Sequence, residues 1–121
     1  MTLPHPLPEE LVELISRRFR LLAEPTRIRL LDRLRDGEAT VQELADELET
    51  TQQNVSKHLA MLADAGILGR RKERTSVHYR IVDDGVLDLC EEVCGSLEGQ
   101  LRSLAALVEG FAARPLERSS R

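Results

Sequence analysis

Residues 50–68, TTQQNVSKHLAMLADAGIL, combine an apolar stripe with a polar face that is rich in hydrogen-bonding groups. Val55, Leu59 and Leu62 recur at helical spacing. The start and the polar side of this helix hold hydroxyls, amides and an amine: Thr51, Gln52, Gln53, Asn54, Ser56 and Lys57. Gln and Asn bond adenine bidentately, Ser and Thr suit bases or phosphates, and Lys suits guanine or phosphate. These residue types predict a helix that contacts the base edges of DNA.

Basic residues follow this helix in a short region of β-prone sequence. The segments 67–71 and 76–82 flank the charged stretch KERT and predict a hairpin. Its candidate contacts to phosphates or to the minor groove are Arg70, Arg71, Lys72 and Arg74. The chain carries a net charge of −4, but residues 51–82 hold six basic side chains and two acids. This asymmetry predicts a surface that binds a polyanion. The alternative for any single residue of the hairpin is a solvated charge without a binding role.

Cys90 and Cys94 stand four residues apart in a helical pattern, so one helix face carries both sulfurs. Thiolates suit soft ions such as As(III), Cd(II), Zn(II) or Cu(I), and they also oxidise or form persulfides. Two cysteines supply two ligands, so a third would come from the partner chain, from Glu91 or from the arm near His5. Three alternatives stay open: the cysteines pack as small hydrophobes, bind a metal or metalloid ion, or undergo redox or sulfur chemistry.

Helical periodicity predicts the elements that must position these groups. Residues 9–23 form a first helix, and a second helix begins near Pro25 and is stopped by Gly37. Thr40 and Glu43 have the spacing of a capping box at the start of a short third helix. The DNA-contacting helix comes next. Two helices joined by a short turn, followed by a basic hairpin, predict a winged helix-turn-helix.

The fourth helix is capped by Thr50 or Thr51 and ends at Gly66. From about residue 84 to residue 112 the pattern is helical again, over a length of ~40 Å. A domain this small cannot cover the apolar side of so long a helix. We therefore expect a homodimer that forms through the first and last helices.

The totals predict one mainly α-helical domain over residues 9–112, between a flexible arm at 1–8 and a disordered tail at 113–121. No apolar run approaches the ~20 residues that span a bilayer, and the first residues lack the pattern of an export signal. Two cysteines do not make a disulfide framework. These features predict a cytoplasmic protein with no membrane partner.

The combination of LAEPTRIRLL, NVSKHLAMLADAGIL and VHYRI resembles the ArsR/SmtB family of bacterial winged-helix repressors, over about residues 19–81. The resemblance implies a homodimer that binds a palindromic operator and dissociates from it when an effector binds. In many members the effector is a metal or metalloid, and in others it is a reactive sulfur species or an oxidant. His58 belongs to the family's S-x-H-L pattern and lies beside the apolar stripe, so we expect it to pack under the helix.

Two effector sites of the family are missing from this sequence. Many members carry a Glu-Leu-Cys-x-Cys segment, but here it reads ELADEL, with Ala45 and Asp46 in place of thiols. Other members bind zinc on the last helix through a carboxylate and histidines. The matching stretch begins at Asp83 and then has the non-ligating residues Gly85, Ser96 and Gly99.

Other function classes fit the residues less well. Ser56, His58 and Asp64 share one helix, but no glycine-rich loop, nucleophile turn or acid pair accompanies them, so we expect no enzyme. A winged helix used only for protein contacts would not need the hairpin cations, and steep salt dependence of duplex binding would separate it from a DNA reader. A repressor with an aromatic ligand pocket would have only two Phe and one Tyr to line it. Within the ArsR/SmtB-type interpretation, the alternative is a regulator with no metal response.

Overall fold

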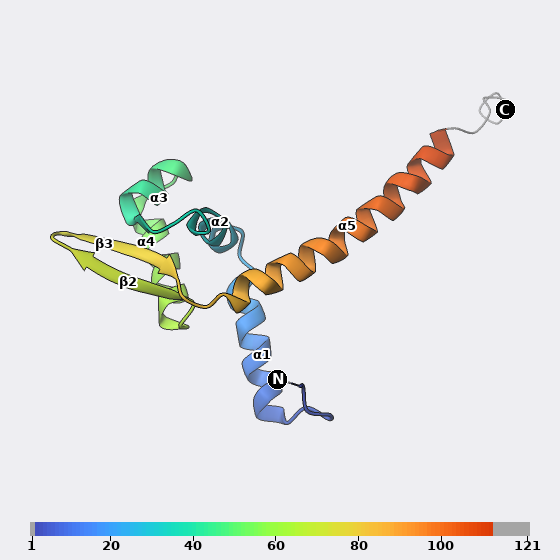
Figure 1. The fold of residues 1–121 in the computed structure, drawn as a ribbon, viewed down its shortest axis with the longest axis horizontal. Coiled ribbons are helices and arrows are strands. Elements are labelled where there is room, and N and C mark those ends of the chain that lie inside the picture. Colours follow the sequence, from blue (N-terminus) through green and yellow to red (C-terminus); the bar gives the residue numbers. More distant parts are fainter. Residues whose placement is uncertain (1, 113–121) are drawn as a thin grey trace. The chain divides into compact units, whose positions relative to one another are not determined.

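The computed structural model describes residues 2–112. In chain order its elements are α1 (Glu9–Leu22), α2 (Pro25–Leu34), β1 (Ala39–Thr40), α3 (Val41–Glu47), α4 (Gln52–Asp64), β2 (Leu68–Glu73), β3 (Ser76–Ile81) and α5 (Gly85–Ala112) (Figure 1). This confirms the predicted mainly α-helical winged helix-turn-helix. The chain divides into two compact units, one ending at Asp84 and one beginning at Gly85. The predicted tail at 113–121 lies outside the described residues, and the single domain and flexible arm stay predictions.

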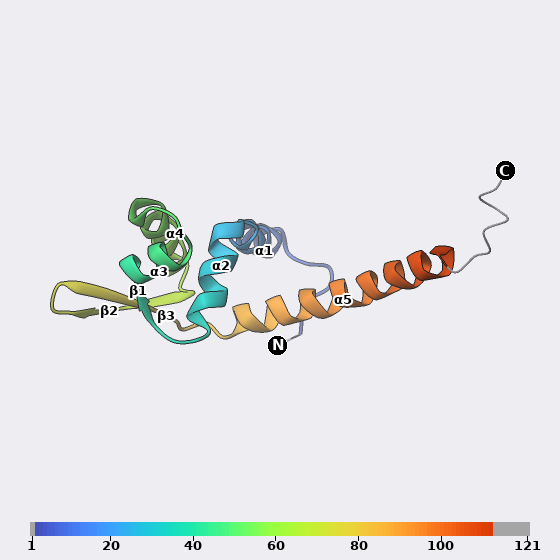
Figure 2. The same ribbon diagram turned by 90° about the horizontal axis from the view of Figure 1, so that it is seen from above.

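The strands form an antiparallel sheet in the order β1-β3-β2. The hairpin of β2 and β3 extends past the helices, as Figures 1 and 2 show. The predicted end of its first strand at residue 71 is wrong, because Lys72 pairs with Val77 and Glu73 pairs with Ser76. The turn is therefore shorter than predicted. Strand β1, which the sequence analysis did not predict, adds two residues to the other edge of β3.

Aliphatic side chains from α2, α3, α4 and the start of β2 make the core of the first unit. The largest fully buried ones are Leu30, Leu31, Leu44, Val55, Leu59, Leu62 and Ile67. Each contributes about 1.5–3 kcal/mol relative to exposure. The predicted stripe of α4 is confirmed, and its burial leaves the opposite side of α4 toward solvent.

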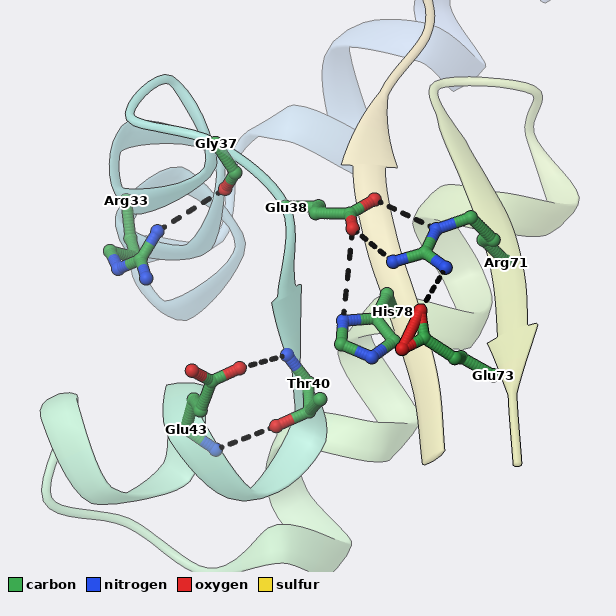
Figure 3. A network of polar contacts seen from close by, with 8 residues as sticks. All are labelled: Arg33, Gly37, Glu38, Thr40, Glu43, Arg71, Glu73 and His78. Carbon is green, nitrogen blue, oxygen red and sulfur yellow. Dashed lines mark hydrogen bonds and ion pairs between the residues drawn. The ribbon is translucent and has the colours of Figure 1, made fainter. Parts of the chain in front are cut away.

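Side chains at the helix starts fix where each helix begins. Glu24 accepts a hydrogen bond from the backbone N–H of Arg27 at 3.0 Å and caps α2. The capping box of α3 is confirmed: Thr40 and Glu43 each accept a hydrogen bond from the other's backbone N–H (Figure 3). Thr51 caps α4. Such caps stabilise a helix by about 1 kcal/mol each and set the register of the residues that follow.

Helix α5 carries exposed apolar side chains along its length. Every side chain from 90 to 110 is exposed. Six large aliphatic ones are 50–71% exposed: Val93, Leu97, Leu101, Leu104, Leu107 and Val108. Within residues 2–112, no helix combines the length and the apolarity that crossing a bilayer requires.

Candidate nucleic-acid interface

The first turns of α4 carry a group of polar side chains that face solvent. Gln52, Gln53, Ser56 and Lys57 are exposed, and none of them has a hydrogen-bond or ion-pair partner within the described part of the chain. Their donors and acceptors are therefore available to a ligand. The backbone around them is held by the core contacts of Val55 and Leu59. This arrangement presents unpaired amide, hydroxyl and amine groups on a rigid helix.

Two of the predicted DNA contacts also serve the local fold. The hydroxyl of Thr51 accepts a hydrogen bond from the backbone N–H of Asn54 at 3.0 Å. The side-chain amide of Asn54 donates to the hydroxyl of Thr50 at 3.2 Å. Asn54 thus braces the start of α4, while Gln53 and Lys57 lie with it around a shallow surface hollow. The structure brings all six predicted residues of α4 and its cap to one end of the helix.

The hairpin of β2 and β3 is the wing of this fold, and its four predicted cations lie in different environments. Lys72 and Arg74 are exposed and have no partner among the residues that the structure describes. Arg74 sits at the tip with a φ of 59°, a conformation that favours glycine. Arg70 lies on the same face of β2 as Lys72, because side chains alternate along a strand.

Arg70 packs against the wing rather than extending from it. Its guanidinium lies 5.7 Å from the centroid of the Tyr79 ring and donates to the Tyr79 hydroxyl at 3.4 Å. Asp64, at the end of α4, is 3.8 Å away and largely exposed, so this ion pair is weak. Arg70 therefore contacts both the wing and the end of α4, and it keeps part of its charge at the surface.

Arg71 is held by two carboxylates on the other face of the wing (Figure 3). It donates to both oxygens of Glu38 and, at 2.7 Å, to Glu73. His78 Nδ1 lies 3.9 Å from the same Glu38 carboxylate. The hydrogen bond from Arg71 holds the pKa of Glu38 below its ordinary value. Sequence analysis missed this role because Glu38, which precedes β1, is far from the wing in the sequence.

Under α4, His58 is buried, as expected, and contacts Arg27 of α2. The guanidinium of Arg27 lies 3.2 Å from His58 Nδ1. Arginine can only donate, so Nδ1 accepts and the ring proton resides on Nε2, which lies 3.8 Å from a Glu24 carboxylate oxygen. Burial lowers the pKa of His58, while the charge of Glu24 opposes that shift. His58 is thus a neutral packing residue that supports the helix rather than a base contact.

Comparison with known proteins gives a consistent result. A family model described as a helix-turn-helix domain matches residues 22–71. The HTH-type transcriptional regulator KmtR of Mycobacterium tuberculosis is 38% identical over 86 residues, which cover 71% of this chain and 66% of that protein. Among solved structures, the antimony-specific transcriptional repressor AntR is 33% identical, with a TM-score of 0.72, and the match covers 82% of this chain and 90% of that chain.

A homodimeric winged helix-turn-helix DNA-binding domain from Mycobacterium bovis, a possible ArsR-family regulator, also matches in structure. It is 26% identical, with a TM-score of 0.68, and the match covers 81% of this chain and 91% of that chain. The chain belongs to the ArsR/SmtB family. It spans 61–66% of the length of the mycobacterial relatives KmtR and SmtB. These relatives are transcriptional regulators and not enzymes.

The positions that the sequence analysis compared with the thiol site of other ArsR/SmtB proteins lie in α3. Ala45 is buried in α3 where a thiol would stand, and Asp46 is exposed. Among the described residues, no three or more His, Cys, Asp or Glu side chains lie together as a metal-binding group. Cys90 and Cys94 are both free and exposed on α5.

Proposed function

We propose that this protein is a transcriptional repressor that binds operator DNA as a homodimer. Helix α4 enters the major groove and contacts base edges through Gln52, Gln53 and Ser56. Lys57, Lys72 and Arg74 contact the phosphate backbone, since their charges have no partner in the described chain. The observation that carries the proposal is the set of unpaired polar side chains at the start of α4, beside a wing with unpaired cations.

Two observations support the homodimer: the exposed apolar side chains of α5 and the homodimeric state of the similar domain from Mycobacterium bovis. Because α5 exposes its apolar side chains along its length, a second copy offers the matching surface. Exposed Val12 and Phe19 give α1 a further apolar patch for this contact. A symmetric dimer would place two copies of α4 on half-sites about one helical turn apart, ~34 Å. We infer that this occurs in the cytoplasm, where the two thiols stay reduced.

Gln53→Ala tests base recognition. We expect it to lower the preference for the operator over random duplex by about 5- to 150-fold at each half-site, because each protomer loses one bidentate base contact. Affinity for random duplex should hardly change, because that binding depends on phosphate contacts. The measurement is a pair of fluorescence anisotropy titrations, one on operator and one on random DNA, over a series of salt concentrations.

Lys72→Ala is the matched control for Gln53→Ala. It should weaken binding to both duplexes alike and reduce the slope of log affinity against log salt by about one for each protomer of the bound dimer. Arg71 is unsuitable for this comparison, since Glu38 and Glu73 already hold its guanidinium. Equal losses on operator and random DNA for Gln53→Ala would show that this side chain does not recognise a base.

We infer further that the effector is a thiophilic species that binds Cys90 and Cys94. Both sulfurs are exposed on α5, and the i, i+4 spacing places them on one helix face. Because the described chain offers no third ligand nearby, a dimer that brings two such pairs together would complete the site. The relative AntR is an antimony-specific repressor, which supports a soft metal or metalloid such as As(III), Cd(II) or Zn(II).

A titration of the reduced, metal-free dimer on operator DNA tests this site. As(III), Cd(II), Zn(II), Cu(I) and a persulfide donor are added separately, with a Cys90→Ser/Cys94→Ser variant alongside. We expect one thiophilic ion to release the wild type and to leave the variant bound. Release by the persulfide donor alone would assign redox or sulfur chemistry to the pair. An equal response of the variant, or no response, would mean that the cysteines only pack in the dimer.

A further inference from the structure

A hollow between α1 and the C-terminal half of α4 has no role in the proposed DNA contacts or thiol site. Its volume is about 430 Å³, and it is lined by Leu14, Arg17, Arg18, Arg20, Leu21, Arg27, Met61 and Ala65. All of these residues belong to the first unit. The volume falls within the roughly 300–1,000 Å³ of typical small-molecule sites. The hollow lies beyond the first turns of α4, which hold the candidate base contacts.

The rim of this hollow is strongly cationic. Arg17 and Arg20 share one carboxylate, that of Glu13, at 3.9 and 4.0 Å, and all three side chains are largely exposed. Arg18 donates to Asp83 at 3.2 Å and to the carbonyl of Ala65 at 3.3 Å. Arg20 also donates to the Ser16 hydroxyl at 2.8 Å. Ion pairs as long and exposed as those of Glu13 are worth little, so Arg17 and the other donors of Arg20 stay available to a ligand.

The walls of the hollow are apolar. Leu14 and Leu21 come from α1, while Met61 and Ala65 come from α4 and its cap. Methionine adapts its shape readily to a bound apolar group. Apolar walls under an arginine rim are complementary to a molecule with a hydrocarbon body and an anionic head, because guanidinium pairs bidentately with carboxylates.

The expected dimer contact leaves this side of α1 free. At 100° per residue, Val12 and Phe19 point about 140–180° away from Arg17 and Leu21 around the helix axis. Val12 and Phe19 are exposed and apolar, and they belong to the face that we assign to the partner copy. A dimer formed through them leaves the side of Arg17 and Leu21 free, and Arg20, about 80–100° from Val12 and Phe19, lies at the edge of that side.

We propose that the hollow between α1 and α4 binds a small anionic amphiphile, a carboxylate on a hydrocarbon body. Arg17 and Arg20 hold the head group, and Leu14, Met61 and Ala65 contact the body. Neither Cys90 nor Cys94 is among the residues that line the hollow. Helix α4 lines the hollow and also carries the side chains that contact DNA. Ligand binding and operator binding are therefore thermodynamically coupled when the DNA-bound and the free protein differ in affinity for the ligand.

Anilinonaphthalene sulfonate, an aromatic anion that fluoresces in apolar sites, is the first probe for the full-length dimer. Decanoate should displace the probe, whereas decanol, with the same chain and no charge, should displace it at least tenfold less well. Arg17→Gln/Arg20→Gln should weaken decanoate binding at least tenfold. The matched control is Arg29→Gln/Arg35→Gln, which removes the same charge from exposed positions of α2 and its cap and should bind decanoate as the wild type does.

Equal competition by decanol, or undiminished decanoate binding by Arg17→Gln/Arg20→Gln, would overturn the proposal and place the probe on other apolar surface. Binding to phosphatidylglycerol vesicles with none to free decanoate would overturn it as well, because a bilayer does not enter the hollow. Operator titrations with decanoate in the Cys90→Ser/Cys94→Ser background then test the coupling. Because this background lacks both thiols, a shift in operator affinity there would support the hollow as a ligand site even if the proposed thiol site is wrong.

Discussion

Leu101→Glu should convert the protein to a monomer that binds its operator at least a hundredfold more weakly. Leu101 is 63% exposed in the single chain, so the substitution leaves the fold of that chain intact. In a symmetric dimer the residue is replaced twice, and each copy places a carboxylate in an apolar contact. Burying such a charge without a partner costs several kcal/mol in each copy.

The loss of operator affinity follows from the loss of the second half-site. Two linked recognition helices gain about 10²- to 10⁴-fold over one, because the second binding event is intramolecular. Sedimentation velocity gives the oligomeric state and fluorescence anisotropy gives the affinity. Circular dichroism of the variant checks that α5 remains helical, since a shorter helix would itself weaken the dimer.

Ala106→Glu is the control for Leu101→Glu. It adds the same carboxylate to α5, five residues further on and about 140° around the helix, at least about 100° from each of the six exposed aliphatic side chains. We expect this variant to stay dimeric and to bind operator as the wild type does. A dimeric Leu101→Glu protein with normal affinity would remove α5 from the interface and leave α1 as the contact.

The sequence was sufficient for the elements whose signals are local. The stripe of Val55, Leu59 and Leu62 fixes which side of α4 is buried, and this in turn fixes which polar side chains are free. The capping box of Thr40 and Glu43 could be predicted for the same reason, because four consecutive residues contain the whole interaction.

What the sequence did not show depends on contacts between distant residues. Strand β1 is two residues long and exists because β3 offers it an edge, which no local pattern reveals. The contact of Arg71 with Glu38 spans 33 positions. Four wing cations that look equivalent in the sequence therefore differ in the fold, and only Lys72 and Arg74 lack partners among the described residues.

The arginines of α1 illustrate the same difference. In the sequence, Arg17, Arg18 and Arg20 belong to an ordinary charged face of an amphipathic helix. Met61 and Ala65 belong to a helix whose polar face was interpreted for DNA alone. The hollow appears only when α1 lies against the end of α4, a contact made by Arg18 through the carbonyl of Ala65. Periodicity assigns a side chain to a face and does not say which element that face meets.

Arg27→Met should lower the free energy of unfolding by about 2–4 kcal/mol, because Arg27 satisfies buried polar groups from two other helices. Its guanidinium donates to the carbonyl of Leu21 at 2.6 Å, to His58 Nδ1 at 3.2 Å and to the sulfur of Met61 at 3.2 Å. Methionine fills much of the space but donates no hydrogen bond. The imidazole nitrogen is then left buried without a donor, and the half-buried carbonyl of Leu21 loses its partner. Urea denaturation followed by circular dichroism measures the change.

Two further variants separate this polar junction from a general effect of removing arginine. Arg29→Met removes the same charge two residues later, from an exposed position of α2, and should change the free energy of unfolding by less than about 0.5 kcal/mol. His58→Leu in the Arg27→Met background removes the orphaned acceptor and should restore part of the lost stability, because replacing both partners of a buried hydrogen bond costs less than replacing one. If the double variant is less stable than Arg27→Met by the full cost of His58→Leu alone, the two side chains act independently. Arg27 then stabilises the fold through the end of α1 rather than through the recognition helix.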